Sequence, residues 1–209
     1  MITKMEEIPV TQESYPFASA ERYLKLSEYG YTEKEYYMYG TANVYETVDE
    51  RGTVGVRTAD VPYVNRIIVR LPEDVKACSG NVVVEIINPT SFMEIDRMWI
   101  LGWKKFVRDG DIYVGITSKP NTIAKLIEFD SKRYGRLSWP NPTLDVPFPD
   151  YLQATGGTGD LNHNYETGLF WDMLTDLAWL LRKEEEMNPI RAYRRDAICL
   201  TGWSQSGSY

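Results

Sequence analysis

The residues best suited to chemistry lie close to the last residue of the sequence. Residues 202–207 read Gly-Trp-Ser-Gln-Ser-Gly, so Ser204 stands between two small residues, Gly202 and Ser206. Small residues two positions before and after a serine allow a strand to turn sharply into a helix, with the hydroxyl exposed at the turn. At such a nucleophile elbow the N–H of the next residue, Gln205, points to where an oxyanion develops, and the helix N-terminus favours negative charge there. The spacing predicts a serine nucleophile for acyl transfer, without metal or cofactor; the alternative is an ordinary turn rich in serine and glycine.

A serine nucleophile needs two further groups. Its hydroxyl is weakly reactive at neutral pH unless a histidine removes the proton and an acidic residue orients that histidine. Residues 205–209 contain neither, and the single histidine, His163, lies upstream in a polar loop, where a solvated turn residue is the favoured interpretation. We therefore expect the acid and the histidine downstream of residue 209, with residues 1–209 as one incomplete, N-terminal portion of a larger domain.

Alternating strands and helices must position this serine. Apolar patterns predict strands at residues 63–71, 82–87, 112–117 and 197–200, a helix at 95–107, and a helix from 170 that ends at Asn188-Pro189. This order implies an α/β fold, with a mostly parallel sheet flanked by helices and an antiparallel N-terminal part. Ligands of such sheets bind at the carboxyl ends of strands, so the segments after Ile87, Thr117 and Thr201 are the candidate site.

Three segments fall outside this pattern. Residues 1–34 are expected to be irregular. Residues 35–45 are rich in tyrosine and predict a half-buried strand, with a sugar-stacking platform as the less favoured interpretation. Residues 118–166 carry many prolines and glycines and predict a long excursion or cap, with a short helix near 122–131; the glycines at 156–159 indicate a flexible loop rather than a dinucleotide site.

The sequence resembles the α/β-hydrolases, and within them the "alpha/beta hydrolase domain" proteins. The segments that carry the resemblance are residues 35–42, 83–88, 113–116, 133–137 and the Gly-Trp-Ser-Gln-Ser-Gly run at 202–207. The resemblance implies Ser204 as nucleophile and the Gln205 N–H as one oxyanion donor. It places the second donor in the loop after the third strand of that fold, here residues 88–91, and Thr90 is our choice because Pro89 has no N–H.

Charge and cysteine content limit the other classes of function. Asp and Glu number 30 against 23 Lys and Arg, a net charge of −7, whereas nucleic-acid binders normally carry a basic excess. No apolar stretch approaches the ~18 residues of a membrane helix, and no Cys/His spacing fits a zinc site. The low cysteine content suggests a reducing, cytoplasmic location, and Cys199 is expected to be buried.

These observations favour a serine hydrolase acting on carboxylic esters or related small acyl substrates. The 209 residues alone are expected to be inactive, because the triad is incomplete. A non-catalytic pseudo-hydrolase or interaction module is the first alternative, and a carbohydrate-binding protein is the second.

Overall fold

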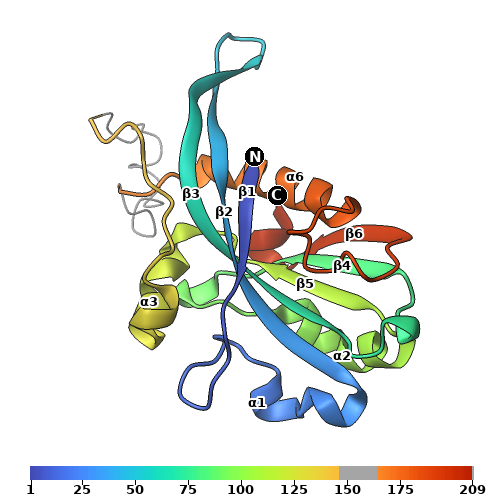
Figure 1. Cartoon of the computed structure of the whole chain (residues 1–209). Helices are drawn as coiled ribbons and strands as arrows, with labels where there is room; N and C mark the ends of the chain where they lie inside the picture. The colour runs from blue at the N-terminus through green and yellow to red at the C-terminus, as the bar shows by residue number, and fades with distance from the viewer. Residues whose placement is uncertain (146–163, 209) are drawn as a thin grey trace.

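The computed structural model describes residues 1–145 and 164–208, which form one mixed sheet with helices on both faces (Figure 1). The strands are β1 (Ile2–Glu7), β2 (Tyr31–Thr47), β3 (Val54–Pro72), β4 (Asn81–Ile86), β5 (Ile112–Ile116) and β6 (Ala197–Gly202). The helices are α1 (Glu21–Leu24), α2 (Arg97–Asp109), α3 (Ile123–Phe129), α4 (Ser131–Tyr134) and α6 (Phe170–Arg182). Short 3-10 turns include η1 (Leu26–Tyr29), η3 (Thr90–Phe92) and η7 (Ser204–Ser208).

The strands lie in the order β1-β2-β3-β5-β4-β6. The pairs β4–β5 and β4–β6 are parallel, and the pairs β1–β2, β2–β3 and β3–β5 are antiparallel. The α/β fold with helices flanking parallel strands and an antiparallel N-terminal part is therefore confirmed. The sheet is mixed rather than mostly parallel as expected, because β3 also pairs antiparallel with β5.

Side-chain alternation along the central strands assigns the helices to opposite faces. Ile112, Val114 and Ile116 of β5 share a buried cluster with apolar residues of α6, whereas Tyr113 lies in a second cluster with Trp99 and Phe106 of α2. Because successive side chains of a strand point to opposite faces, α6 and α2 cover the two sides of the sheet. Both faces are thus shielded from water, which explains the almost continuous apolar runs of β4 and β5.

The strand order places the expected ligand-binding crevice beside β4. The chain runs from β4 through α2 to β5 on one side, and from β5 it crosses to β6 on the other side of β4. Such a reversal of strand order separates the loops that follow the two neighbouring strands and leaves room for a ligand between them. The loops after β4 and β6 are therefore the ones to inspect.

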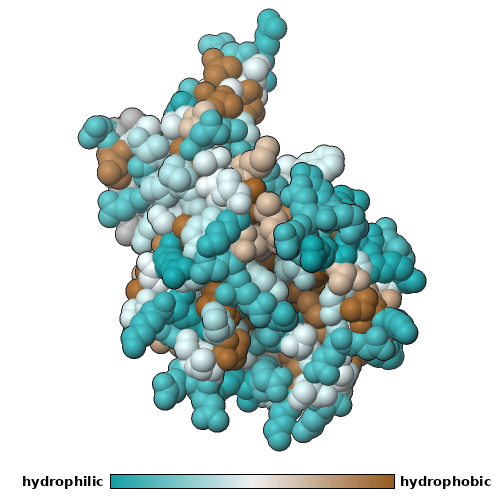
Figure 2. All heavy atoms as spheres, viewed as in Figure 1, coloured by the Kyte–Doolittle hydropathy of each residue, from teal (hydrophilic) through white to brown (hydrophobic). Residues whose placement is uncertain are grey.

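Strands β2 and β3 are much longer than the rest and project from the body as a two-stranded arm (Figure 1). β1 pairs with β2 only as far as Gly40, so the outer part of the arm lacks this third strand. Val48, Val54 and Val56 are exposed on the arm, whose apolar surface is visible in Figure 2.

Two expectations about the ends of the chain are wrong. Residues 1–34 are not irregular throughout, since they contain β1, α1 and η1 and the first residues of β2. β1 has only Ile2 fully buried, so its strand character comes from pairing with β2 and leaves little apolar pattern. Cys199 is exposed rather than buried, because β6 lies at an edge of the sheet. Leu200, the next residue of β6, is also exposed.

β4, β5, β6 and α2 agree with expectation to within a few residues, whereas β3 begins at Val54, well before the strand expected at residues 63–71. α2 ends at Gly110, which has a left-handed backbone, φ 76°. α6 ends at Arg182, earlier than expected, because the Asn188 side chain donates to the carbonyl oxygens of Leu181 and Lys183, at 3.2 and 2.8 Å. Of the excursion, α3 and α4 are observed, while residues 146–163, with the glycine loop and His163, lie outside the described residues. Among the described residues, no helix has the length and apolar character needed to cross a membrane.

Candidate active site

The chain leaves β6 through a sharp turn at Ser204. This residue has φ 54°, a left-handed backbone conformation that is uncommon for a residue with a side chain. Such conformations cost energy and persist only where the surrounding structure holds them. The side chain of Ser204 is exposed, and η7 begins at this residue.

The small residues on either side are required by a close backbone approach. A Cβ atom on Gly202 would lie 2.3 Å from the carbonyl oxygen of Ser206, so only glycine fits without rearrangement. Ser206 is buried, and its hydroxyl donates to the Trp203 carbonyl at 3.0 Å and accepts from the Trp203 N–H at 3.2 Å. The turn predicted from small residues around Ser204 is thus present, with Gly202 and Ser206 in contact across it.

Asn88 joins this turn to the loop after β4. Its buried side chain donates through Nδ2 to the carbonyl oxygen of Trp203, at 2.6 Å, directly before Ser204. Its Oδ1 accepts from the N–H of Thr90, at 3.0 Å, and from the Thr90 hydroxyl. One amide therefore connects the two loops at the crevice beside β4.

The Thr90 N–H, expected to face an oxyanion, is engaged with Asn88 in this structure. The two residues that follow it, Ser91 and Phe92, have φ 57° and 61°, so backbone strain is present on this side of the crevice as well as at Ser204. The Asn88 side chain holds the loop after β4 close to the loop after β6. Gln205 is exposed beside Ser204.

Buried ion pairs fasten the far end of the β4 loop. Glu94 pairs with Arg66 of β3, and Asp96 pairs with Arg70 of β3 at 2.5 Å. All four side chains are buried. Burial raises the pKa of the Glu94 and Asp96 carboxyls, and the arginines oppose this shift. The loop that carries Thr90 is therefore held at one end by Asn88 and at the other by β3.

Glu85, near the end of β4, is buried like Glu94 and Asp96 but is not paired with an arginine within the described part of the chain. Its carboxylate accepts from the Tyr113 hydroxyl at 2.7 Å and from the Met98 N–H at 3.0 Å, and no basic side chain pairs with it among the described residues. Burial raises its pKa to about 7, against the lowering effect of these two donors. It faces α2, below the sheet's carboxyl edge, so it supports the fold rather than the crevice.

Three exposed apolar side chains come from the same two loops. Phe92 and Met93 follow β4 and Trp203 follows β6, and each is 40% exposed or more. Ligand pockets combine such apolar surface with a few polar groups. Among the described residues, no group of three or more His, Cys, Asp and Glu side chains could hold a metal ion.

The sequence predicts the turn at Ser204 but gives no sign of the side chains that support it. The expected oxyanion loop, residues 88–91, includes Asn88, but the sequence does not indicate its contact with Trp203. An asparagine directly after a buried strand is a signal for a turn or cap. Arg66 and Arg70 alternate with apolar residues as solvent-facing side chains would, and nothing in that pattern reveals their buried partners. Glu85 inside an otherwise apolar run was the visible exception.

A family model described as "Alpha/beta hydrolase domain" matches residues 4–209. The chain belongs to this family. No curated protein sequence matches it. Among solved structures, a proposed acetyl xylan esterase from Bacteroides fragilis is 12% identical with a TM-score of 0.37, over 99% of this chain and 42% of its own. A glucuronoyl esterase from Teredinibacter turnerae is 12% identical with a TM-score of 0.34, over 98% of this chain and 39% of its own. The chain therefore spans about two fifths of the length of these two proteins.

Proposed function

We propose that this alpha/beta hydrolase domain acts on carboxylic esters or related small acyl compounds, with Ser204 as the nucleophile. One observation carries the proposal: a serine with φ 54° directly after a parallel strand, in a turn where Gly202 packs on the Ser206 backbone. At a nucleophile elbow, a serine in this conformation has its hydroxyl exposed at the turn, and Ser204 is exposed.

In the proposed reaction the Ser204 Oγ attacks the ester carbonyl carbon and passes its proton to a base. The negative charge that forms on the carbonyl oxygen is stabilised by backbone N–H groups. The intermediate collapses to an acyl-serine as the alcohol leaves with a proton, and water then releases the acid by the same route. No metal or cofactor enters these steps.

The N–H of Gln205 is proposed as the first oxyanion donor and that of Thr90 as the second. Because the Thr90 N–H donates to Asn88 Oδ1 at 3.0 Å, a developing oxyanion must compete with this amide oxygen. A full negative charge is a stronger acceptor than an amide oxygen. The Thr90 N–H is therefore expected to move from Asn88 Oδ1 to the substrate oxygen only when the tetrahedral intermediate forms.

The proposed location is the cytoplasm. Cys78 and Cys199 are both unpaired, and Cys199 is exposed, which suits a reducing compartment. The net charge of −7 agrees with a small-molecule substrate rather than a nucleic acid as the partner.

The test uses the natural full-length protein. A fluorophosphonate probe is expected to label Ser204, and Ser204→Ala should abolish both the labelling and the hydrolysis of p-nitrophenyl acetate. Ser208→Ala, in the same turn, is the control and should keep both. Labelling that persists in Ser204→Ala would refute the assignment.

Residues 1–209 expressed alone are expected to show little or no hydrolysis, because residues 205–209 contain no histidine and no acid to activate Ser204. Turnover at ordinary enzyme rates by this polypeptide would instead indicate a base within it.

A further inference from the structure

A groove lies where the projecting arm meets α6, and it shares no residue with the candidate active site. Side chains of β2, β3 and α6 enclose about 600 Å³, within the range of small-molecule sites. The residues that matter for its chemistry are Tyr45, Glu46, Thr47, Trp171, Asp172 and Thr175. The first turn of α6 is fixed to β2 there, because Asp172 accepts from the Asn43 N–H at 2.8 Å.

Two aromatic rings face this groove from different elements. Trp171 of α6 is 51% exposed and Tyr45 of β2 is 38% exposed. The Tyr45 hydroxyl donates to Asp172 Oδ1 at 2.7 Å, which fixes the direction of the ring while its face stays accessible. A ring held in place before binding loses little conformational entropy when a ligand packs on it.

The polar groups of the groove are mainly acceptors. Asp172 and Glu46 supply carboxylate oxygens, and Thr47 and Thr175 supply hydroxyls; the Thr175 hydroxyl donates to the Trp171 carbonyl at 2.9 Å and can still accept. Among the described residues that line the groove there is no Lys or Arg. The negative charge favours ligands that donate hydrogen bonds and disfavours anionic ones.

We propose that this groove is a binding site for neutral carbohydrate. A sugar ring has one apolar C–H face that packs on an exposed indole or phenol, and its hydroxyls donate to carboxylates at the rim. The groove is open, since Tyr45, Glu46, Thr47, Trp171 and Thr175 are all exposed. An open aromatic surface suits a saccharide chain, whereas organic cations are bound where several rings surround the charge.

The test is titration of the full chain with the neutral hexasaccharides cellohexaose, xylohexaose and maltohexaose, followed by calorimetry. At least one is expected to bind with a Kd below about 1 mM. Trp171→Ala should weaken this binding about tenfold or more, and Trp179→Ala is the matched control, because Trp179 is 62% exposed on the same helix but lies outside the groove.

Tyr45→Phe adds a milder variant that keeps the ring and removes its bond to Asp172. It should weaken binding by a smaller factor than Trp171→Ala, about threefold, without unfolding the protein. Urea unfolding of each variant checks that the fold is intact. Three results would overturn the proposal: no binding of any hexasaccharide up to about 10 mM, equal losses in Trp171→Ala and Trp179→Ala, or Trp171-dependent binding of choline or of trigalacturonate without binding of neutral sugars.

Discussion

At the scale of single residues, burial changes the ordinary chemistry of Glu85. Its carboxyl lies on β4 and accepts from the Tyr113 hydroxyl and the Met98 N–H. Desolvation disfavours the charged form, so its pKa rises from 4.5 to about 7. The folded protein therefore holds a proton on Glu85 over a pH range in which the unfolded chain has released it.

This shift predicts a pH dependence of stability that Glu85→Gln removes. Between about pH 4.5 and 7 the folded state binds more protons than the unfolded state, so the contribution of Glu85 to stability falls as pH rises and is constant above pH 7. The difference over that window is about 3 kcal/mol. Urea unfolding of both proteins from pH 4.5 to 8 measures it, and parallel curves for wild type and Glu85→Gln would contradict the prediction.

At the scale of elements, the candidate site depends on how two loops are joined. Asn88 follows β4 and holds both the Trp203 carbonyl and the Thr90 N–H, at 2.6 and 3.0 Å. The relative position of Ser204 and Thr90, the proposed nucleophile and oxyanion donor, is therefore set by one amide rather than by either loop alone. Positioning of this kind affects the transition state more than substrate binding.

Asn88→Ala is expected to lower kcat for p-nitrophenyl acetate at least tenfold in the intact protein, with little change in KM, if Ser204 is the nucleophile. It should also destabilise the fold by about 1–3 kcal/mol, because buried polar groups lose their partner. Asn81→Ala, at the opposite, exposed end of β4, is the control. Equal kinetic effects of the two substitutions would show that Asn88 does not position the site.

Two glycines of the turn at Ser204, Gly202 and Gly207, differ in how closely the backbone approaches them, and this allows a separate prediction. A Cβ on Gly202 would meet the Ser206 carbonyl oxygen at 2.3 Å, whereas a Cβ on Gly207 would lie 3.2 Å from the Gly202 carbonyl oxygen. Gly202→Ala should therefore abolish fluorophosphonate labelling of Ser204, and Gly207→Ala should only reduce it. If both variants label like wild type, the turn tolerates a side chain and the elbow geometry is wrong.

The elements that sequence could predict are those whose burial follows a regular period. α2 shows an apolar face and ends at Gly110, and β4 and β5 are covered on both faces, so their patterns are strong. β1 and β6 are edge strands with few buried side chains. They form by pairing with a neighbouring strand, and the burial of their side chains cannot be read from an apolar pattern. The turn at Ser204 could be predicted because the need for small residues at Gly202 and Ser206 is local, whereas the contact between Asn88 and Trp203 joins residues 115 positions apart.

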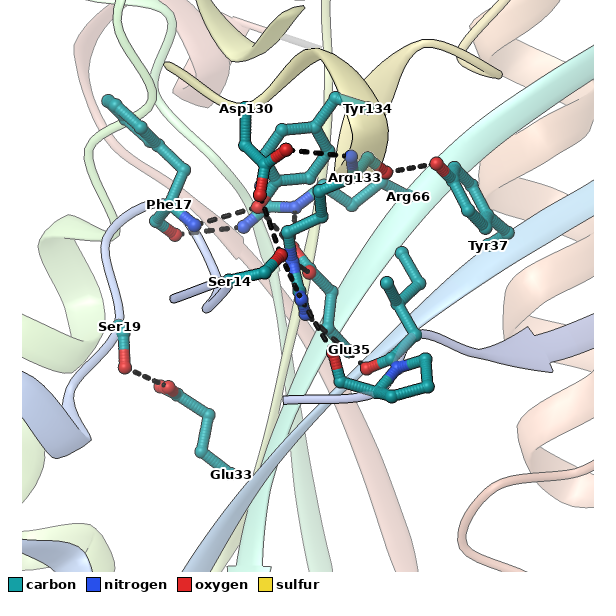
Figure 3. A network of polar contacts seen from close by, with 12 residues as sticks. Ser14, Phe17, Ser19, Glu33, Glu35, Tyr37, Arg66, Asp130, Arg133 and Tyr134 are labelled. Atoms are coloured by element: carbon teal, nitrogen blue, oxygen red, sulfur yellow. Dashed lines mark hydrogen bonds and ion pairs between the residues drawn. The ribbon is translucent and has the colours of Figure 1, made fainter. Parts of the chain in front are cut away.

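At the scale of the whole molecule, buried arginines attach the N-terminal segment to the sheet. Arg66, Arg70 and Arg133 donate to the carbonyl oxygens of Phe17, Ala18 and Pro9, at 2.9, 2.9 and 2.7 Å. Their charges are balanced by buried carboxylates, and Figure 3 shows Glu35 of β2 between Arg66 and Arg133. A segment with little regular structure is thus ordered by side chains from β3 and α4. No periodic pattern in residues 8–20 could have indicated this.

The final prediction tests this attachment with two arginines that are three residues apart. Arg133 is buried and pairs with Glu35 at 2.6 Å, whereas Arg136 is 59% exposed at its side chain and pairs with Glu6 at 2.7 Å. Arg133→Met leaves the Glu35 charge and the Pro9 carbonyl with fewer partners, so the free energy of unfolding should fall by about 3–5 kcal/mol. Arg136→Met removes an exposed ion pair, a hydrogen bond to the Tyr39 hydroxyl and a contact with the Tyr37 ring, and should change the free energy of unfolding by less than about 1 kcal/mol. Urea unfolding measures the free energy of unfolding of both variants. Similar losses of stability in the two variants would show that the buried network does not hold the N-terminal segment. If only Arg133→Met is strongly destabilised, residues 8–20 should also be proteolysed faster in that variant alone.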